Sequence, residues 1–382
     1  MLAIKNAKIM TMVGEIIENG DVLISESEGK ILNVGSNLEI PKNCKIVDGT
    51  GKTVLPGFVD AHTHLGIGEE DIGWAGKDYD ESTDPVTPHL KAIDAINPAD
   101  TGLKDAYKGG VTTVMVTPGS SNIFGGECCV IKTYGKTVDE MLLKEPAGIK
   151  AAVGENPKRD YGSKQNKAPK TRMGIAAIMR KTLSETQEYL NKKNNNDNNF
   201  EKDIKLESLL PVLNKEIPLK IHAHRADDIM TAIRIAKEFN INITIEHCTE
   251  GHLVTKKLFE ENIPAIVGPT FGERSKNELK NKSFKTAGIL SNNKVKVAIM
   301  SDHGVTPTQY LPIYAALSIK AGMDDLEALK AITINPAEIL GVDDRVGSIE
   351  KGKDADLIIF SGDPLDIRSK VEEVYIDGKK VK

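Results

Sequence analysis

The stretch Pro56-Gly57-Phe58-Val59-Asp60-Ala61-His62-Thr63-His64-Leu65-Gly66 is an apolar, β-favouring run that reaches a His-x-His pair and stops at a glycine. Successive side chains on a strand point to opposite faces, so His62 and His64 share one face. Two imidazoles at one strand end can bind the same metal ion. Taken alone, the pair is equally compatible with two ordinary histidines beside a turn, so the rest of the chain must decide.

The bulk composition limits the class of protein. The chain has 382 residues, 40% of them hydrophobic, and a net charge of −5. This length allows one large domain and a small one. The slight acidity argues against nucleic-acid binding, and no apolar run approaches the roughly 20 residues that cross a bilayer. We expect a cytoplasmic protein with a small-molecule substrate, no nucleic-acid or membrane partner, and the option of forming a homo-oligomer.

The two ends of the chain share one pattern. Short β-type runs, punctuated by Gly, Asn and Asp, fill residues 1–55 and again residues 346–382. Neither end is long enough to bury a core alone. We therefore expect the two ends to pair into one small β-sandwich domain.

Residues 56–345 show a different pattern, in which short β-type runs alternate with helical stretches, as is typical of parallel βα units. This alternation predicts an α/β fold with a TIM-type βα-barrel, and the alternative is an open doubly wound sheet. An Asn- and Lys-rich segment at 191–199 is expected to be a surface loop. The predicted strands are 57–62, 112–116, 128–132, 149–153, 219–222, 243–247, 265–267 and 296–300, and the predicted helices are 99–108, 138–144, 174–191, 227–239, 251–261 and 324–332.

Potential metal ligands stand where the predicted strands end. In a βα-barrel these carboxyl ends meet at the face that carries the chemistry. Imidazoles and carboxylates are the ligands that zinc-like ions prefer. Each residue alone could be a packed histidine or a helix cap, but their joint position favours a metal site. The candidates are His62, His64, Glu155, His222, His247 and Asp302.

Four motifs in order along the chain resemble those of the amidohydrolase superfamily: Pro56–His64, Ile221–His224, Ile245–Cys248 and Ser301–Gly304. The tail, 332–337 with 347–357, is similar too, and the chain looks closest to the imidazolonepropionase-related group. The resemblance implies a metal-bearing barrel with a small β domain made from both termini. It implies one or two divalent ions, zinc first and manganese, iron or nickel as alternatives. By position, His62, His64, His222 and His247 match the family's ligands, and Asp302 matches the aspartate that contacts the metal and shuttles the proton.

Two departures from the family pattern bear on the chemistry. Many binuclear members bridge their ions with a carboxylated lysine at the end of the fourth strand. Lys150 and Lys220 fall at the starts of their predicted strands, so we expect neither to reach the site and Glu155 to be the substitute. Deaminating members usually carry a glutamate three residues after the fifth-strand histidine. This chain has Arg225 there, which favours amide hydrolysis over deamination.

Further residues are candidates for binding the substrate. A basic loop directly follows Glu155. Arg159 or Arg172 in this loop could hold a substrate carboxylate, and the alternative is a solvated loop without a binding role. His224 shares a strand face with His222, so it is a candidate substrate contact, an additional ligand or a loop histidine. His303 follows the last-strand aspartate and is a candidate substrate contact.

These features together predict a metal-dependent amidohydrolase. We expect hydrolysis of a C–N bond, of the cyclic amide or N-acyl type, in a small substrate that could be anionic. Metal-activated water would attack, with Asp302 as general base and then general acid. The alternatives are a dipeptidase or prolidase-like peptidase, a deaminase of a cyclic amidine, and a catalytically silent scaffold protein that kept the fold.

Overall fold

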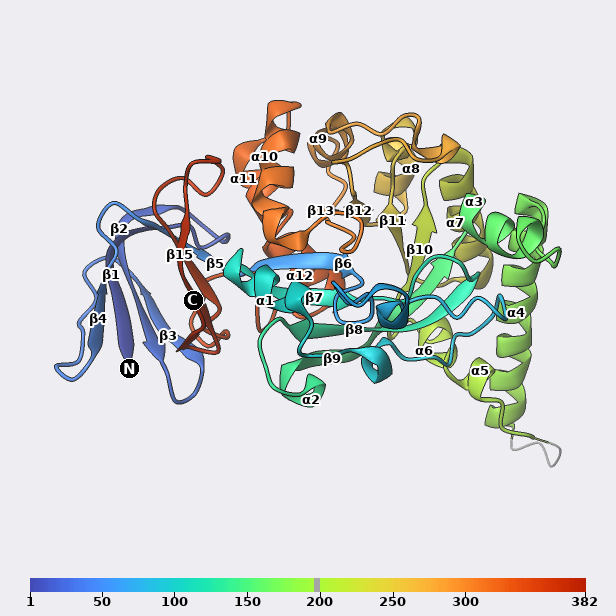
Figure 1. Ribbon diagram of the computed structural model, residues 1–382, viewed down its shortest axis with the longest axis horizontal. Coiled ribbons are helices and arrows are strands. Elements are labelled where there is room, and N and C mark those ends of the chain that lie inside the picture. Colours follow the sequence, from blue (N-terminus) through green and yellow to red (C-terminus); the bar gives the residue numbers. More distant parts are fainter. Residues whose placement is uncertain (196–199) are drawn as a thin grey trace.

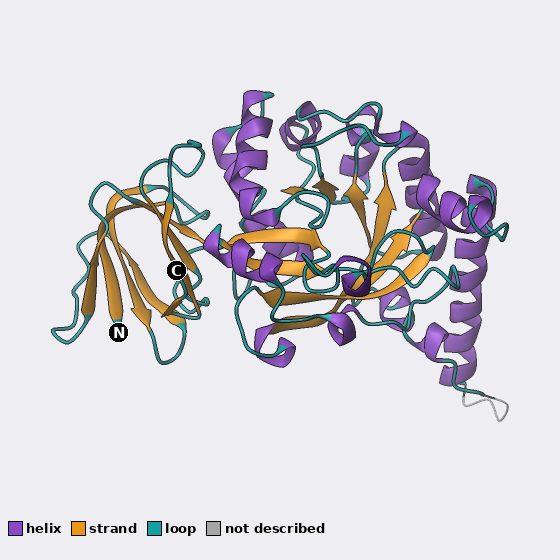
Figure 2. Ribbon diagram, viewed as in Figure 1, coloured by secondary structure: helices purple, strands orange, loops and turns teal. Residues whose placement is uncertain are grey.

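Two sheets of eight strands each make up the computed structural model, which describes residues 1–195 and 200–382 (Figure 1). One sheet combines segments from both ends of the chain, and both termini lie in this part of the molecule. The other sheet curves into a barrel surrounded by helices (Figure 2). Strands from the two chain ends are thus hydrogen-bonded in one sheet.

The terminal sheet has the strand order β16-β15-β14-β5-β1-β2-β3, with β4 paired to β1. Its two halves meet where β14 pairs antiparallel with β5, from Leu357 opposite Pro56 to Phe360 opposite Thr53. Apolar side chains such as Ile4 form a buried core beneath it. The strands are β1 (Leu2–Ile9), β2 (Ile17–Ser25), β3 (Lys30–Gly35), β4 (Lys45–Asp48), β5 (Thr53–Pro56), β14 (Leu357–Phe360), β15 (Val371–Ile376) and β16 (Lys379–Lys380).

The barrel sheet has the order β13-β12-β11-β10-β9-β8-β7-β6, and a parallel bridge between Thr63 and His303 brings its two edges together. Most of these strands are buried along their whole length, as expected for strands covered on both faces. The strands are β6 (Phe58–Thr63), β7 (Val111–Val116), β8 (Phe124–Lys132), β9 (Leu142–Ala152), β10 (Leu219–Ala223), β11 (Ile243–His247), β12 (Ala265–Val267) and β13 (Val297–Ile299).

The expectation of an all-parallel barrel is wrong for one strand. β8 runs antiparallel to both β7 and β9. Only the segment 117–123 connects β7 to β8, and a parallel crossover needs about a dozen residues or more. The predicted run 128–132 omitted the first four residues of β8, so the short connection was not evident from the sequence.

The helices lie outside the barrel (Figure 2). The predicted helix 138–144 is wrong in its second half, because α2 ends at Met141 and β9 begins at Leu142. The other predicted helices overlap observed ones, whereas α9, α10 and α12 were not predicted. The predicted loop at 191–199 is wrong in its first part, because α4 continues to Asn194, and its residues 196–199 lie outside the described residues. Within the described ranges, no helix combines the length and apolar character needed to cross a membrane. The α-helices are α1 (Thr101–Lys108), α2 (Val138–Met141), α3 (Glu155–Pro157), α4 (Arg172–Asn194), α5 (Ile204–Glu207), α6 (Leu210–Leu213), α7 (Ala226–Phe239), α8 (Thr255–Glu260), α9 (Lys285–Asn292), α10 (Leu311–Lys320), α11 (Asp325–Lys330) and α12 (Ile334–Leu340).

Candidate metal centre and active site

One group of potential ligands joins the two edges of the barrel sheet. His62 lies in β6, His64 follows that strand, and Asp302 follows β13. Asp302 Oδ1 lies 3.5 Å from His62 Nε2 and 3.3 Å from His64 Nε2. The three side chains offer ligand atoms that all lie within 4.8 Å of one another. The structure therefore brings together the residues predicted from the first and last strands.

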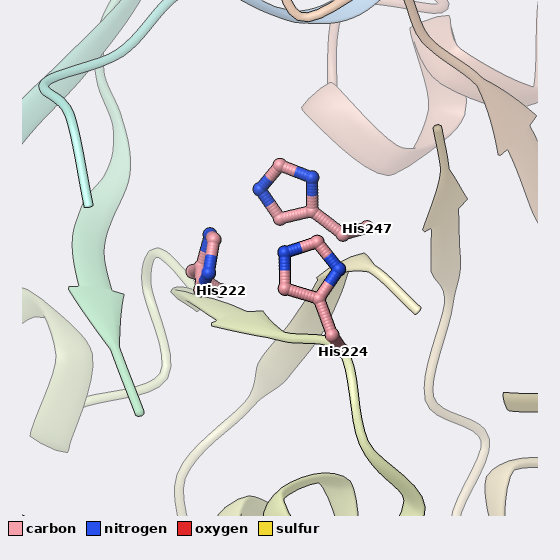
Figure 3. Close-up of side chains that lie close together, drawn as sticks. All are labelled: His222, His224 and His247. Atoms are coloured by element: carbon pink, nitrogen blue, oxygen red, sulfur yellow. The ribbon is translucent and has the colours of Figure 1, made fainter. Parts of the chain in front are cut away.

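A second group consists of three imidazoles that point toward one another (Figure 3). His222 lies in β10, His224 directly follows that strand, and His247 ends β11. The ring centroids are 4.6 Å apart for His222 and His224, 4.2 Å for His222 and His247, and 4.5 Å for His224 and His247. The two-residue period of β10 gives His222 and His224 one face, as predicted. His224 is thus a member of this group.

The backbone at the end of β11 aims two neighbouring side chains at the site. In a regular strand, Glu246 and His247 would point to opposite faces. His247 has a φ of +69°, in the left-handed region that side chains other than glycine rarely adopt. The resulting turn lets Glu246 contact His62 while His247 joins the second group. Asp302 also has a positive φ, +55°, and such strained backbone is typical of functional sites.

Hydrogen bonds fix the orientation of four of the site histidines. In each ring Nδ1 has a partner, which leaves Nε2 free to face the centre. His62 Nδ1–H donates to the carboxylate of Glu246, and the others contact two backbone carbonyls and a hydroxyl. The distances are 2.7 Å from His62 to Glu246 Oε2, 2.7 Å from His64 to Thr117 O, 2.8 Å from His224 to Thr249 Oγ1 and 2.9 Å from His247 to Gly268 O.

Burial sets the charge state of these groups. It lowers the pKa of His62 to about 4 and that of His247 to about 3, with nearby positive charge adding to the effect on His62. Burial also places the pKa values of His222 and His224 well below the ordinary range. Burial alone would raise the pKa of Asp302, but the adjacent histidines hold it below its usual value. At neutral pH the site therefore holds four neutral imidazoles, those of His62, His222, His224 and His247, beside the ionised carboxylate of Asp302.

Lys150 corrects one of the sequence-based expectations. Its Nζ lies 3.2 Å from His62 Nε2 and 3.1 Å from the carbonyl oxygen of Pro118, and the side chain is fully buried. The strand β9 begins at Leu142 rather than at residue 149, so Lys150 lies near the carboxyl end of its strand. Burial lowers the pKa of its amine. A lysine of the fourth barrel strand therefore does reach the site.

Glu155, by contrast, belongs to neither ligand group. It begins the short helix α3, and its backbone N–H donates to Glu278 Oε2 at 3.1 Å. Its prediction as a ligand rested on a strand that ended at residue 153. The strand ends one residue earlier, and the chain turns at Gly154 with a φ of +86°.

The predicted substrate contacts have other partners. The guanidinium of Arg159 pairs with Asp160, and that of Arg172 donates to both carboxylate oxygens of Asp228 at 2.9 and 3.1 Å. His303 is buried, and its Nε2 lies 3.2 Å from a carboxylate oxygen of Glu70. None of these three residues is part of either ligand group.

Two carboxylates at the site escaped the sequence-based analysis. Glu246 had a usable signal, because a glutamate inside an otherwise apolar buried strand requires a partner. Its carboxylate is fully buried, and although burial raises its pKa, the hydrogen bond with His62 and the positive charge of Lys220 lower it to about 2. Glu278 had no such signal, since it lies in a charged loop between β12 and α9, far from any predicted strand end.

The donor set fits a divalent metal ion. Buried imidazole nitrogens without a hydrogen-bond partner include Nε2 of His222, His224 and His247. Burying an unpaired polar atom costs about 1–3 kcal/mol, so several such atoms around one point call for a common partner. Nitrogen donors with a few carboxylates are the ligands of zinc and similar ions.

Comparison with known proteins gives the family. Residues 53–381 match the amidohydrolase family. The chain belongs to this family. It is a hydrolase that acts on carbon–nitrogen bonds. The family characteristically binds divalent metal ions, in agreement with the two ligand groups.

Individual relatives have modest sequence identity to this chain, and a solved structure shares its fold closely. A crystal structure of an amidohydrolase from Thermotoga maritima MSB8 is 46% identical, with each chain fully covered and a TM-score of 0.96. An imidazolonepropionase of Porphyromonas gingivalis is 26% identical over 87% of this chain and 80% of its own length. The amidohydrolase tasK of Hapsidospora irregularis is 27% identical over 94% of this chain, which spans only 39% of that relative. The relation to imidazolonepropionases confirms the predicted group.

Proposed function

We propose that this chain hydrolyses the C–N bond of a small cyclic amide or N-acyl compound, with Asp302 moving the proton. The observation that carries the proposal is the convergence of two ligand groups at one end of the barrel. When bound, a divalent ion would polarise the scissile carbonyl and lower the pKa of a water molecule. Zinc is the first candidate, with manganese, iron or nickel as alternatives. The proposed ligands are His62, His64, Asp302, His222, His224 and His247.

Asp302 has the position and charge state for proton transfer. Its carboxylate is ionised and nearly buried, beside His62 and His64. It accepts the proton of the attacking water and returns it to the leaving nitrogen as the C–N bond breaks. Burial keeps competing solvent away from this carboxylate during the transfer.

Lys150, rather than Glu155, would supply the group that bridges two divalent ions when these are bound. Its amine lies beside His62, and its pKa is lowered by burial, which favours the neutral form. A neutral amine can add carbon dioxide and release a proton, and the carbamate formed would offer its two oxygens to divalent ions. This arrangement favours two ions over one.

Two observations refine the reaction and the substrate. Arg225, at the position of the deaminase glutamate, is partly exposed and pairs with Asp227 at 2.8 Å, so it supplies no proton shuttle. Arg159 and Arg172 keep side-chain exposures of 46% and 33%, so an approaching carboxylate could still contact them. Hydrolysis is therefore favoured over deamination, and an anionic substrate stays an option, with His303 as a further candidate contact.

We also propose a division into domains. Residues 1–55 and 346–382 form the small β-sandwich domain, and residues 56–345 form the TIM-type hydrolase barrel. The pairing of β5 with β14 supports the first part, and the bridge between the edges of the barrel sheet supports the second.

A substrate screen with a variant tests the function. Zinc-loaded protein is offered lactams, N-acyl amino acids, dipeptides and cyclic amidines, and we expect turnover of a lactam or an N-acyl compound. Asp302→Asn should lower kcat by about 10²–10⁴-fold, as loss of a general acid–base does. Arg225→Gln is the control and should leave kcat unchanged.

The other outcomes contradict the proposal in distinct ways. Turnover of dipeptides alone identifies a peptidase, and ammonia release from amidines identifies a deaminase. A protein that binds neither zinc nor manganese would be a catalytically silent scaffold. Full activity in Asp302→Asn removes this residue from the reaction.

A further inference from the structure

A buried glutamate from the loop after β12 lies against the second ligand group. Glu278 is 1% exposed, and its Oε1 lies 3.8 Å from His222 Nε2 and 3.7 Å from His224 Nε2. The opening for its carboxylate is at Gly154, where a Cβ atom would lie 3.0 Å from Glu278 Oε2. A glycine at this turn therefore lets the carboxylate approach the histidines closely.

Donors on its outer side hold the carboxylate in place. Oε2 accepts the backbone N–H of Glu155 at 3.1 Å. The ammonium of Lys276 lies 2.7 Å from Oε1, without the alignment of a hydrogen bond, and it also donates to Asn156 Oδ1 at 3.0 Å. Ligating carboxylates are themselves commonly held by such neighbours.

The polar atoms that face the second ligand group lack hydrogen-bond partners. Glu278 Oε1 and the Nε2 atoms of His222, His224 and His247 are all buried without a hydrogen-bond partner. With Nδ1–H of His224 donating to Thr249 Oγ1 and that of His247 to Gly268 O, their Nε2 atoms are acceptors and cannot satisfy the anionic Oε1 of Glu278. A cation among them would satisfy the nitrogens and would share Glu278 Oε1 with the ammonium of Lys276, which lies 2.7 Å from it.

We propose that Glu278 is a carboxylate ligand of the ion held by His222 and His224. Two ligands of one tetrahedral zinc ion, with bonds of about 2.0–2.2 Å, lie about 3.4 Å apart, close to the observed 3.7 and 3.8 Å. Glu278 thus has the role that strand-end reasoning gave to Glu155. The inference rests on the proposed metal centre and adds a ligand from outside the barrel strands.

Metal binding by a matched pair of variants tests this assignment. Glu278→Gln keeps the size of the side chain and an oxygen that can accept the Glu155 N–H, but removes the charge. Glu155→Gln makes the same chemical change on the residue whose backbone contacts Glu278. Each full-length variant is freed of metal with a chelator and titrated with zinc, and with cobalt followed by its visible absorption.

We expect Glu278→Gln to bind one equivalent of zinc at least 10-fold more weakly than the unaltered chain and to change the cobalt spectrum. Glu155→Gln should match the unaltered chain in both measurements. Unfolding curves of the metal-free proteins check that both variants fold.

Three results would overturn the assignment. Unchanged zinc affinity and cobalt spectrum in Glu278→Gln, with only KM altered, would make Glu278 a substrate contact. Equal effects of the two substitutions would make its role structural. Failure of the unaltered chain to bind zinc or cobalt would remove the proposed metal centre itself and the present assignment with it.

Discussion

At the scale of single residues, buried histidines make the stability of the metal-free protein depend on pH. Burial lowers the pKa of His62 to about 4 and of His247 to about 3, whereas an imidazole in an unfolded chain titrates near 6.5. As the pH falls below about 6.5, the unfolded state gains protons that the folded state does not bind. The free energy of unfolding therefore decreases as the pH decreases, until the pH reaches the pKa values of the folded state.

Between pH 7 and pH 5 we expect His62 and His247 each to lower the free energy of unfolding by about 2 kcal/mol. Asp60 should raise the free energy of unfolding by about 1 kcal/mol over the same pH interval. Burial raises its pKa to about 6, so the folded state binds a proton that the unfolded state does not. The effect of the two histidines is larger than that of Asp60, so the folded protein is less stable at pH 5 than at pH 7. Urea unfolding of chelator-treated protein at several pH values measures the effect, and His62→Asn should reduce the slope. A free energy of unfolding that stays constant or rises as the pH falls would contradict this expectation.

At the scale of secondary-structure elements, the sequence predicted where most barrel strands lie but not how neighbouring strands pair. The first, fifth, sixth and last barrel strands each carry their ligand within or next to a short apolar run, so His62, His222, His247 and Asp302 were evident from the sequence. The direction of β8 and the length of β9 depend on which strands pair, which no local run records. The approach of Lys150 to His62 was missed for this reason, and Glu278 was missed because a loop brings it to the site.

The length of β9 gives a prediction about metal binding. Lys150→Ala removes the amine beside His62 and should lower the zinc content of the purified protein from the proposed two equivalents to one or none. Acetate or propionate, which can occupy the vacated space as a carboxylate, should partly restore it. Lys144→Met on the same strand is the control, because Lys144 Nζ donates to the carbonyl of Leu340, outside the site. Equal zinc content in both variants would rule out a bridging role for Lys150.

At the scale of the whole molecule, a buried ionic network joins the barrel to the terminal sheet. Lys132 ends β8, and its ammonium lies 2.8 Å from Asp354, 2.9 Å from Asp356 and 2.6 Å from Asp377. Lys132, Asp354 and Asp356 are almost completely buried. Lys30 also contacts Asp354, at 2.6 Å, but its side chain is 38% exposed. Three cations thus share this carboxylate, because Arg345 also lies 2.7 Å from it and is 38% exposed, and Lys132 is the buried one among them.

The difference in burial predicts a difference in stability. Lys132→Met leaves buried carboxylates without their central cation, which typically costs about 3–5 kcal/mol. Lys30→Met removes a partly exposed partner of the same Asp354, for which about 1 kcal/mol or less is expected. Urea unfolding of zinc-loaded proteins compares the two. Adding Asp356→Asn to Lys132→Met should recover part of the loss, because one uncompensated charge disappears. Similar small losses in both single variants, or no recovery in the double variant, would mean that solvent reaches the network and that other contacts hold the terminal sheet on the barrel.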